Sequence, residues 1–220
     1  MKSQGVTDVQ IGFLISLNFI IGTILALFAG VMVDKIGRRR TTILFGLISW
    51  PGSALLNFFA HSFWMFALAQ IVCAFSKISD IGWQLILIED ADDEQRLTSF
   101  NMFGIIDILA GFFTPVAGVI VGNLGLVKAE RGFLLFGAIC MFIMIIHRHF
   151  KFHETDMGRL AVERSRAVSY WGTLKNSLTQ MKSVAASGNR KLSCVLVIVV
   201  LFNAYQPIGA YSSLYFAPYL

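Results

Sequence analysis

The sequence predicts an all-α fold, that of a polytopic helical membrane protein with about six transmembrane helices. The chain is 56% hydrophobic and only 14% charged, whereas soluble domains average about 25% charged residues. Its mean hydropathy is +0.69. The apolar residues gather in runs of membrane length, because about 20 helical residues cross the hydrocarbon core, and most charges stand between these runs.

Six apolar segments are predicted to span the membrane. They cover residues 9–33, 41–60, 63–88, 99–122, 132–147 and 192–216. The second segment contains Trp50-Pro51-Gly52, which predicts a kink or an opening of the helix, because proline lacks a backbone N–H donor. The fifth segment is the shortest of the six.

The distribution of the cations predicts the orientation of these spans. If Arg38–Arg40 lie in the cytoplasm, the inside segments hold fourteen Lys and Arg residues (five up to Arg96 and nine from Arg148 to Lys191), and the outside segments hold three. Cytoplasmic loops carry such an excess. The sequence therefore predicts an integral protein of the plasma (inner) membrane with both termini outside. The net charge of +5 indicates topology and attraction to the lipid bilayer, not nucleic-acid binding.

The segment between the first two spans has a distinctive pattern, G-x-x-x-D-[RK]-x-G-R-[RK]-[RK]. Its fixed positions are Gly30, Asp34, Lys35, Gly37, Arg38, Arg39 and Arg40. Gly30 would let two helices approach closely, and Gly37 would supply a tight turn. Asp34 could pair with a guanidinium or cap a helix N-terminus. The pattern resembles the signature loop of the major facilitator superfamily, between the second and third spans of that family; an ordinary Gly- and Arg-rich cytoplasmic turn is the alternative.

The resemblance extends from the second to the seventh span of that family. It implies a partial major-facilitator bundle and secondary active transport of a small solute by alternating access, in which two helix bundles rock about a central site. Residues 1–147 would form five helices of the N-terminal bundle, 148–191 a cytoplasmic linker with an amphipathic helix, and 192–220 the first helix of the C-terminal bundle. The family's first span and its last five have no counterpart. We therefore expect a truncated chain, and a non-transporting protein that packs against other membrane subunits is the alternative function.

The segment 89–98, EDADDEQRLT, carries five carboxylates and one arginine. Within the resemblance, Glu89, Asp90 and Arg96 match an acidic stretch ending in Arg between the family's fourth and fifth spans. The segment is either a solvated turn or a partner of the three arginines in a network of ion pairs. Gln70 and Ala74 stand where the drug–proton antiporters of the family carry Arg and Gly, which puts that activity in doubt.

Polar residues inside the spans are the candidates for binding a solute or an ion, because such groups usually face the bundle interior or a water-filled cavity. They are Lys77, Asp80, Asp107, Asn203, Tyr205 and Gln206. Lys77 and Asp80 share a helix face, and Asp80 and Asp107 are expected at matching depth. These three charges either form a structural salt bridge or include an ion- or proton-carrying carboxylate tuned by Lys77; a third alternative is that Asp80 lies nearer the inner surface of the membrane. Pro115, Gly118 and Pro207 are candidates for gating, with ordinary helix packing as the alternative.

Motifs of enzymes and of ATP-driven pumps do not occur in the sequence. There is no Gly-x4-Gly-Lys-Ser/Thr, no His-Glu-x-x-His and no set of Ser, His and Asp at one depth. We therefore expect no enzyme activity, no cofactor and no metal site. The expected partners are a small-molecule solute, with a coupling proton or ion left open, and the lipid bilayer.

Overall fold

The computed structural model describes residues 5–166, 169–186, 194 and 197–198. Within these residues the chain forms α-helices and no strand. The helices are α1 (Asp8–Ile36), α2 (Arg38–Phe59), α3 (Phe63–Ala74), α4 (Ser76–Glu89), α5 (Asp93–Gly111), α6 (Phe113–Leu124), α7 (Leu126–Lys151), α8 (Asp156–Arg166) and α9 (Tyr170–Ala186). This confirms the predicted all-α fold class.

Five stretches are long and apolar enough to cross a membrane. They are Asp8–Ile36, Arg38–Phe59, Phe63–Glu89, Asp93–Leu124 and Leu126–Lys151. Each overlaps one of the first five predicted spans and extends beyond the prediction at one or both ends, and only the second, Arg38–Phe59, also ends one residue before its predicted end at residue 60. The predicted sixth span, 192–216, falls almost entirely outside the described residues.

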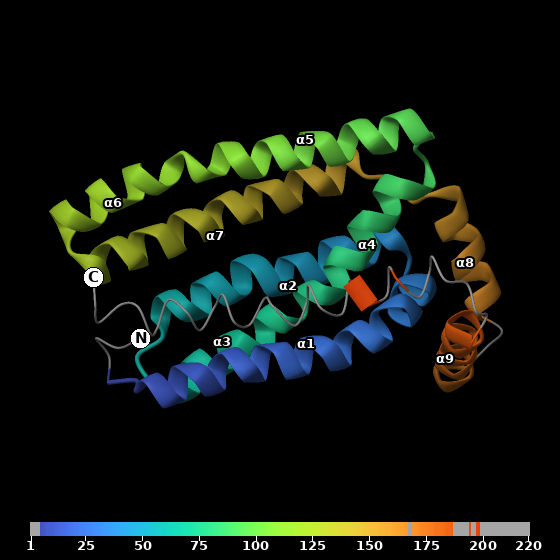
Figure 1. The fold of residues 1–220 in the computed structure, drawn as a ribbon, viewed down its shortest axis with the longest axis horizontal. Coiled ribbons are helices and arrows are strands. Elements are labelled where there is room, and N and C mark those ends of the chain that lie inside the picture. Colours follow the sequence, from blue (N-terminus) through green and yellow to red (C-terminus); the bar gives the residue numbers. More distant parts are fainter. Residues whose placement is uncertain (1–4, 167–168, 187–193, 195–196, 199–220) are drawn as a thin grey trace.

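The spans run up and down as antiparallel neighbours (Figure 1). The turns at Gly37, at 90–92 and at 152–155 lie at one end of the bundle, here called the Gly37 end. The turns at 60–62 and at Gly125 lie at the opposite end, here called the Gly125 end. Helices α8 and α9 lie beyond the Gly37 end, and both contact α1.

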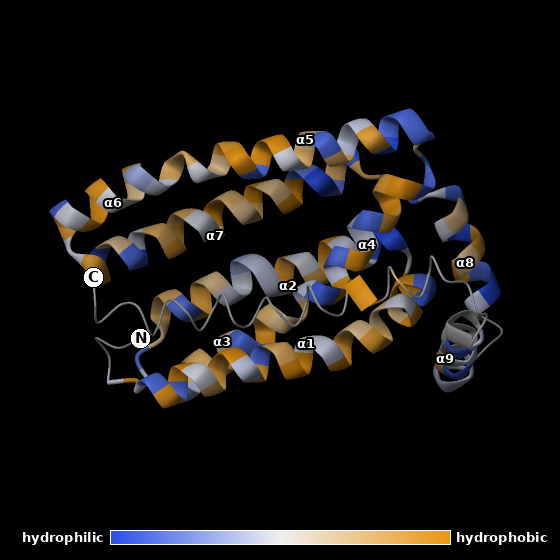
Figure 2. Cartoon of the chain, in the orientation of Figure 1, coloured by the Kyte–Doolittle hydropathy of each residue, from blue (hydrophilic) through white to orange (hydrophobic). Residues whose placement is uncertain are grey.

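Helix α2 is the central element of the bundle. It packs against α7, α4 and α3, while α1 packs against α3 and α4. The stretch α5–α6 runs alongside α7, and its helices bury no residue among those described. Apolar residues cover the middle of the spans and polar residues gather at the ends (Figure 2). This distribution matches a bundle whose sides face lipid and whose ends face water.

Two spans that the sequence predicts as single helices are interrupted by one residue each. At Phe112 the N–H donates to the Leu109 carbonyl at 3.1 Å, and α6 begins at the next residue. Pro115 explains this interruption, because its ring clashes with the carbonyl four residues earlier and it offers no N–H. At Phe75 the N–H donates to the Val72 carbonyl at 3.2 Å, with no proline nearby.

Helix α2, by contrast, continues through Pro51. The residues Trp50-Pro51-Gly52 therefore do not interrupt the helix, and the predicted kink stays a prediction. Proline is tolerated within a spanning helix when neighbouring helices and local adjustments compensate for the freed backbone group. Because α2 packs against three other helices, its tertiary contacts can maintain the helix across this residue.

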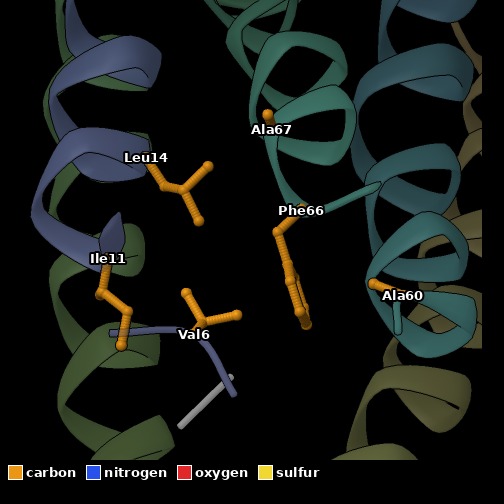
Figure 3. Packing of buried hydrophobic residues seen from close by; sticks show 6 residues of the cluster. All are labelled: Val6, Ile11, Leu14, Ala60, Phe66 and Ala67. Atoms are coloured by element: carbon orange, nitrogen blue, oxygen red, sulfur yellow. The ribbon is translucent and has the colours of Figure 1, made fainter. Parts of the chain in front are cut away.

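Two clusters of buried apolar side chains hold the bundle together. The first lies near the Gly125 end, where Leu14 of α1 and Phe66 of α3 are 1% and 4% exposed (Figure 3). The second lies nearer the Gly37 end and joins Val33 of α1, Phe45 of α2 and Ile78 of α4. The first cluster joins α1 and α3, and the second joins α1, α2 and α4.

Among the glycines of the spanning helices, the tightest contact with a neighbouring helix occurs at Gly82 and not at Gly30. A Cβ atom at Gly82 would lie 2.5 Å from Thr42 Oγ1, so α4 meets α2 at van der Waals distance there. Around Gly30 no described atom would lie within 4 Å of such a Cβ. The predicted helix contact at Gly30 is therefore not formed by the described residues.

Candidate functional site

The signature segment is almost entirely helical, and Gly37 is the single residue between α1 and α2. Gly37 has φ 100° and ψ 151°, a conformation that glycine adopts without steric cost. The predicted tight turn at Gly37 is confirmed. Asp34 and Lys35 belong to the last turn of α1, and the three arginines form the first turn of α2. Cations are unfavourable at the positive end of a helix dipole, so this helix start requires nearby anions.

Arg38 forms ion pairs with two such anions, Asp34 and Glu89. Its Nη1 donates to Asp34 Oδ1 at 2.8 Å, and its Nη2 donates to Glu89 Oε1 at 3.0 Å. The Arg38 side chain is 7% exposed and the Glu89 side chain 13%. The predicted ion-pair network between the acidic segment and the arginines is thus confirmed for Glu89. It connects the end of α1, the start of α2 and the end of α4.

Arg96 does not take part in this network. Its Nη1 donates to Asp93 Oδ1 at 3.1 Å, and its Nε donates to the Ile88 carbonyl at 2.9 Å. The Asp93 side chain is 99% exposed. Arg96 therefore stabilises the start of its own helix, α5.

Glu154 supplies a further anion, which the sequence did not reveal. Its Oε1 accepts a hydrogen bond from the backbone N–H of Arg38 at 2.7 Å, and its Oε2 accepts one from the backbone N–H of Arg39 at 3.0 Å. One carboxylate thus satisfies two of the free N–H groups at the start of α2. The sequence signal was weak, because Glu154 is a single acidic residue within the predicted linker.

The neighbouring Thr155 extends the network to α8. Its hydroxyl donates to Glu89 Oε2 and accepts the N–H of Gly158 at 2.9 Å. Thr155 is 1% exposed. Farther along α8, Ser165 Oγ donates to the Asp34 carbonyl at 3.1 Å, and Lys35 Nζ donates to the Ser165 carbonyl at 3.2 Å. Two hydrogen bonds at Ser165 therefore attach α8 to the end of α1.

A cavity of about 540 Å³, open to the outside of the bundle, lies between α2, α4, α5 and α7. Two of the predicted candidates, Asp80 and Asp107, line it together with Arg148. The rest of the lining is aromatic or thioether: Trp50, Trp83, Phe100, Phe103, Met141 and Met144. Ligand sites commonly have this composition, an apolar wall with a few polar groups.

Lys77 does not line this cavity. Its side chain lies across Gly22 of α1, since a Cβ there would be 3.4 Å from Lys77 Cγ. Among the described residues Lys77 makes no ion pair with Asp80 or Asp107. Lys77 and Asp80 are near enough for their charges to interact, but the predicted salt bridge is not formed.

The cation that lines this cavity is Arg148, which the sequence predicts in the linker and not in a span. The predicted fifth span ended at residue 147, whereas α7 continues to Lys151. The predicted segment, 132–147, is shorter than the roughly 20 residues that a crossing helix needs, so its length already indicated that the helix extends farther. The other predicted binding and gating residues, Asn203, Tyr205, Gln206 and Pro207, lie outside the described residues.

The fold and the site together define a class: an integral membrane protein of antiparallel spanning helices, with a charge network at one end and, between its helices, an apolar cavity that carries a few charged groups. A family model described as the Major Facilitator Superfamily matches residues 1–219. The chain therefore belongs to the major facilitator superfamily, whose members are transporters, and the resemblance stated above is confirmed. Neither the curated proteins nor the solved structures contain a match to this chain.

Proposed function

We propose that this chain takes part in secondary active transport of a small solute by alternating access. The observation that supports this proposal is the network of Asp34, Arg38 and Glu89, which joins three spanning helices at one end of the bundle. Alternating access requires contacts that stabilise one arrangement of the helices and break in the other. A network confined to one end meets this requirement.

The burial of the network favours two discrete states over a gradual change. Arg38 and Glu89 are largely removed from water, with side chains 7% and 13% exposed. Separating such a pair without solvent is strongly unfavourable, because a buried charge loses its partner. If the Gly37 end opens, water reaches both groups and replaces the lost hydrogen bonds. The network would therefore have two states: intact and shielded from water when the Gly37 end is closed, or separated and hydrated when that end is open.

The cavity and the interrupted helix supply the remaining parts of the proposal. Asp80 and Asp107 are proposed to contact the solute or a coupling ion, since both line the cavity. Pro115 and Gly118 are proposed to allow bending, because the helix is already interrupted at Phe112. Location in the plasma membrane with both termini outside is retained as a proposal based on the cation distribution. The division into a bundle part, a cytoplasmic linker and a further helix is retained as a proposal based on the family resemblance.

The test is uptake into proteoliposomes that contain the purified full chain. A panel of labelled amino acids, sugars, monocarboxylates and organic cations is offered with and without an imposed proton or sodium gradient. We expect gradient-dependent accumulation of at least one class. Asp34→Asn should lower that uptake rate about tenfold, because typical coupling free energies correspond to changes of roughly this size. Membrane insertion should not change. Asp93→Asn is the matched control, since Asp93 is 99% exposed and outside the network.

Two results would count against the proposal. If the wild-type chain accumulates no solute under any gradient, the non-transporting alternative is supported. If Asp34→Asn transports at the wild-type rate, the network has no part in the transport cycle.

A further inference from the structure

Arg148 is placed unusually for a cation inside a helix bundle. Its guanidinium carbon lies 5.1 Å from the Trp50 ring centroid and 5.9 Å from that of Trp83. These contacts are cation–π interactions. Its Nη1 atom is buried and has no hydrogen-bond partner among the described residues. A buried charged donor without an acceptor is unfavourable. Because Nη1 has almost no accessible surface, an anionic or carbonyl oxygen in the cavity would reach it after a small rotation of the guanidinium.

Asp80 does not meet that need directly. It lines the same cavity as Arg148, and the two charges are near enough to interact. Yet Arg148 and Asp80, both among the described residues, form no ion pair with each other: every Arg148 nitrogen lies more than 4.0 Å from the Asp80 carboxylate oxygens. Two opposite charges that face one cavity without touching leave room for a ligand group between them. Arg148 would bind the negative part of that group, and Asp80 the positive part.

The charge balance of the lining selects among possible ligands. The cavity contains two carboxylates, Asp80 and Asp107, and one guanidinium, that of Arg148. A simple organic anion would satisfy Arg148 but lie beside both carboxylates. A simple organic cation would satisfy a carboxylate and leave Arg148 Nη1 without an acceptor. A zwitterion satisfies both needs at once, because charge-assisted hydrogen bonds form at each end.

The rest of the cavity indicates the remainder of the ligand. Its volume of about 540 Å³ and its aromatic and methionine lining suit an apolar body of substantial size. Aromatic side chains bind rings in stacked or edge-to-face contact, and methionine adapts its shape to them. A small zwitterion such as glycine would leave most of this surface uncovered.

We propose that this cavity binds a zwitterionic amino acid with a large aromatic or apolar side chain. The ligand carboxylate accepts hydrogen bonds from Arg148, the ammonium group donates to Asp80, and the side chain lies among Phe100, Phe103, Met141 and Met144. The inference rests on the proposed transport function, because it names the chemical class of the solute.

The test compares three probes that share one ring and differ in charge. They are L-phenylalanine, its amide, which lacks the carboxylate, and 3-phenylpropionate, which lacks the ammonium group. Affinities are measured by equilibrium dialysis and by competition against labelled L-phenylalanine, on the purified full chain in lipid nanodiscs with no gradient. We expect L-phenylalanine to bind at least tenfold more tightly than either analogue, and glycine to compete at least tenfold more weakly. Equal affinities for all three aromatic probes, or undetectable binding of L-phenylalanine, would overturn the inference.

Two variants assign the charges to the ends of the ligand. In Arg148→Gln the affinities for L-phenylalanine and its amide should converge, and in Asp80→Asn those for L-phenylalanine and 3-phenylpropionate should converge. Arg96→Gln is the control, because Arg96 is a cation at the same end of the bundle that does not line the cavity. This variant should keep the wild-type order of affinities for the three probes. Arg148→Lys serves if the glutamine variant fails to fold, and should preserve the order at reduced affinity. An unchanged order in Asp80→Asn would overturn the assignment of Asp80.

This experiment separates the inference from the proposed function, because binding is measured without transport. If L-phenylalanine binds with the expected order and proteoliposomes take up no solute, the binding site is supported and the transport function fails. If proteoliposomes accumulate another solute and L-phenylalanine does not bind, transport stands and the inference is overturned.

Discussion

Arg38 and Glu89 stand 51 positions apart in the chain, and the Arg38 guanidinium donates to the Glu89 carboxylate at 3.0 and 3.2 Å. Little of either side chain reaches water. The ion pair of Arg96 and Asp93 lies at the same end of the bundle, with side chains 38% and 99% exposed. The chain therefore contains a shielded pair and an exposed pair that can be compared directly.

Glu89→Gln should destabilise the protein by about 2 kcal/mol, the usual size of a lost hydrogen bond to a charged group. Asp93→Asn should cost less than about 1 kcal/mol, because exposed ion pairs contribute little. Both values can be measured by reversible unfolding in mixed micelles, followed by circular dichroism. Equal losses in the two variants would mean that the Arg38–Glu89 pair contributes no more than a surface pair.

Gly37→Ala should destabilise the protein by about 1–3 kcal/mol. At φ 100° and ψ 151° the backbone is in a region that is nearly exclusive to glycine. A Cβ at this position would also lie 2.7 Å from Glu154 Oε2. Gly30→Ala is the matched control within the same motif, and it should be neutral or stabilising by up to about 1 kcal/mol, because alanine favours a helix interior. Comparable losses at both glycines would contradict the assigned turn.

Glu154→Ala should increase amide hydrogen exchange at Arg38 and Arg39. Loss of a capping side chain typically costs about 1 kcal/mol, which corresponds to roughly fivefold faster exchange if opening is local. The measurement is hydrogen–deuterium exchange resolved to peptides that cover the start of α2. Glu163→Ala is the control, since Glu163 borders the same surface near Gly37 but makes no hydrogen bond to these amides. No change at Arg38 and Arg39 would rule out the cap.

Cysteine labelling in intact cells tests the orientation of the bundle. In a background without Cys73, Cys140 and Cys194, Lys128→Cys should react with an impermeant maleimide and Glu163→Cys should not. Both positions are exposed in the structure, whereas the adjacent Ala129 is buried and unsuitable. Reaction of Glu163→Cys in intact cells, with lysed cells as the positive control, would reverse the predicted orientation.

The spans were predictable because long apolar runs leave few alternatives for a chain of this composition. Their ends were less predictable. The fifth predicted span ended at residue 147, but α7 continues through Arg148 to Lys151, since a long arginine side chain can stay in a helix while its charge lies against aromatic rings. The interruption at Phe112 has a visible cause in Pro115. The interruption at Phe75 has no comparable signal in the sequence.

The candidate site was predictable where opposite charges stand near one another at span ends. Asp34, Arg38 and Glu89 were identified in this way. Depth along a helix was not sufficient for the cavity, because it does not specify the direction in which a side chain projects. Lys77 and Asp107 were expected to meet, yet Lys77 lies across Gly22 of α1, and Arg148 is the cation that lines the same cavity as Asp107. Glu154 could not be predicted, because its capping role depends on how the chain folds back after α7.

The one-residue connection at Gly37 has a mechanical consequence for the whole bundle. When two rigid helices are joined by a single residue, the φ and ψ angles of that residue largely determine the angle between them. A tilt of α1 therefore changes the position of α2 unless the torsion angles of Gly37 change. The Glu154 carboxylate accepts hydrogen bonds from two backbone amides next to Gly37, and the adjacent Thr155 accepts one from Gly158 at the start of α8. Any change in the angle between α1 and α2 would therefore displace the start of α8, and a fluorophore on the exposed face of α8 would report motion of the spans from outside the membrane.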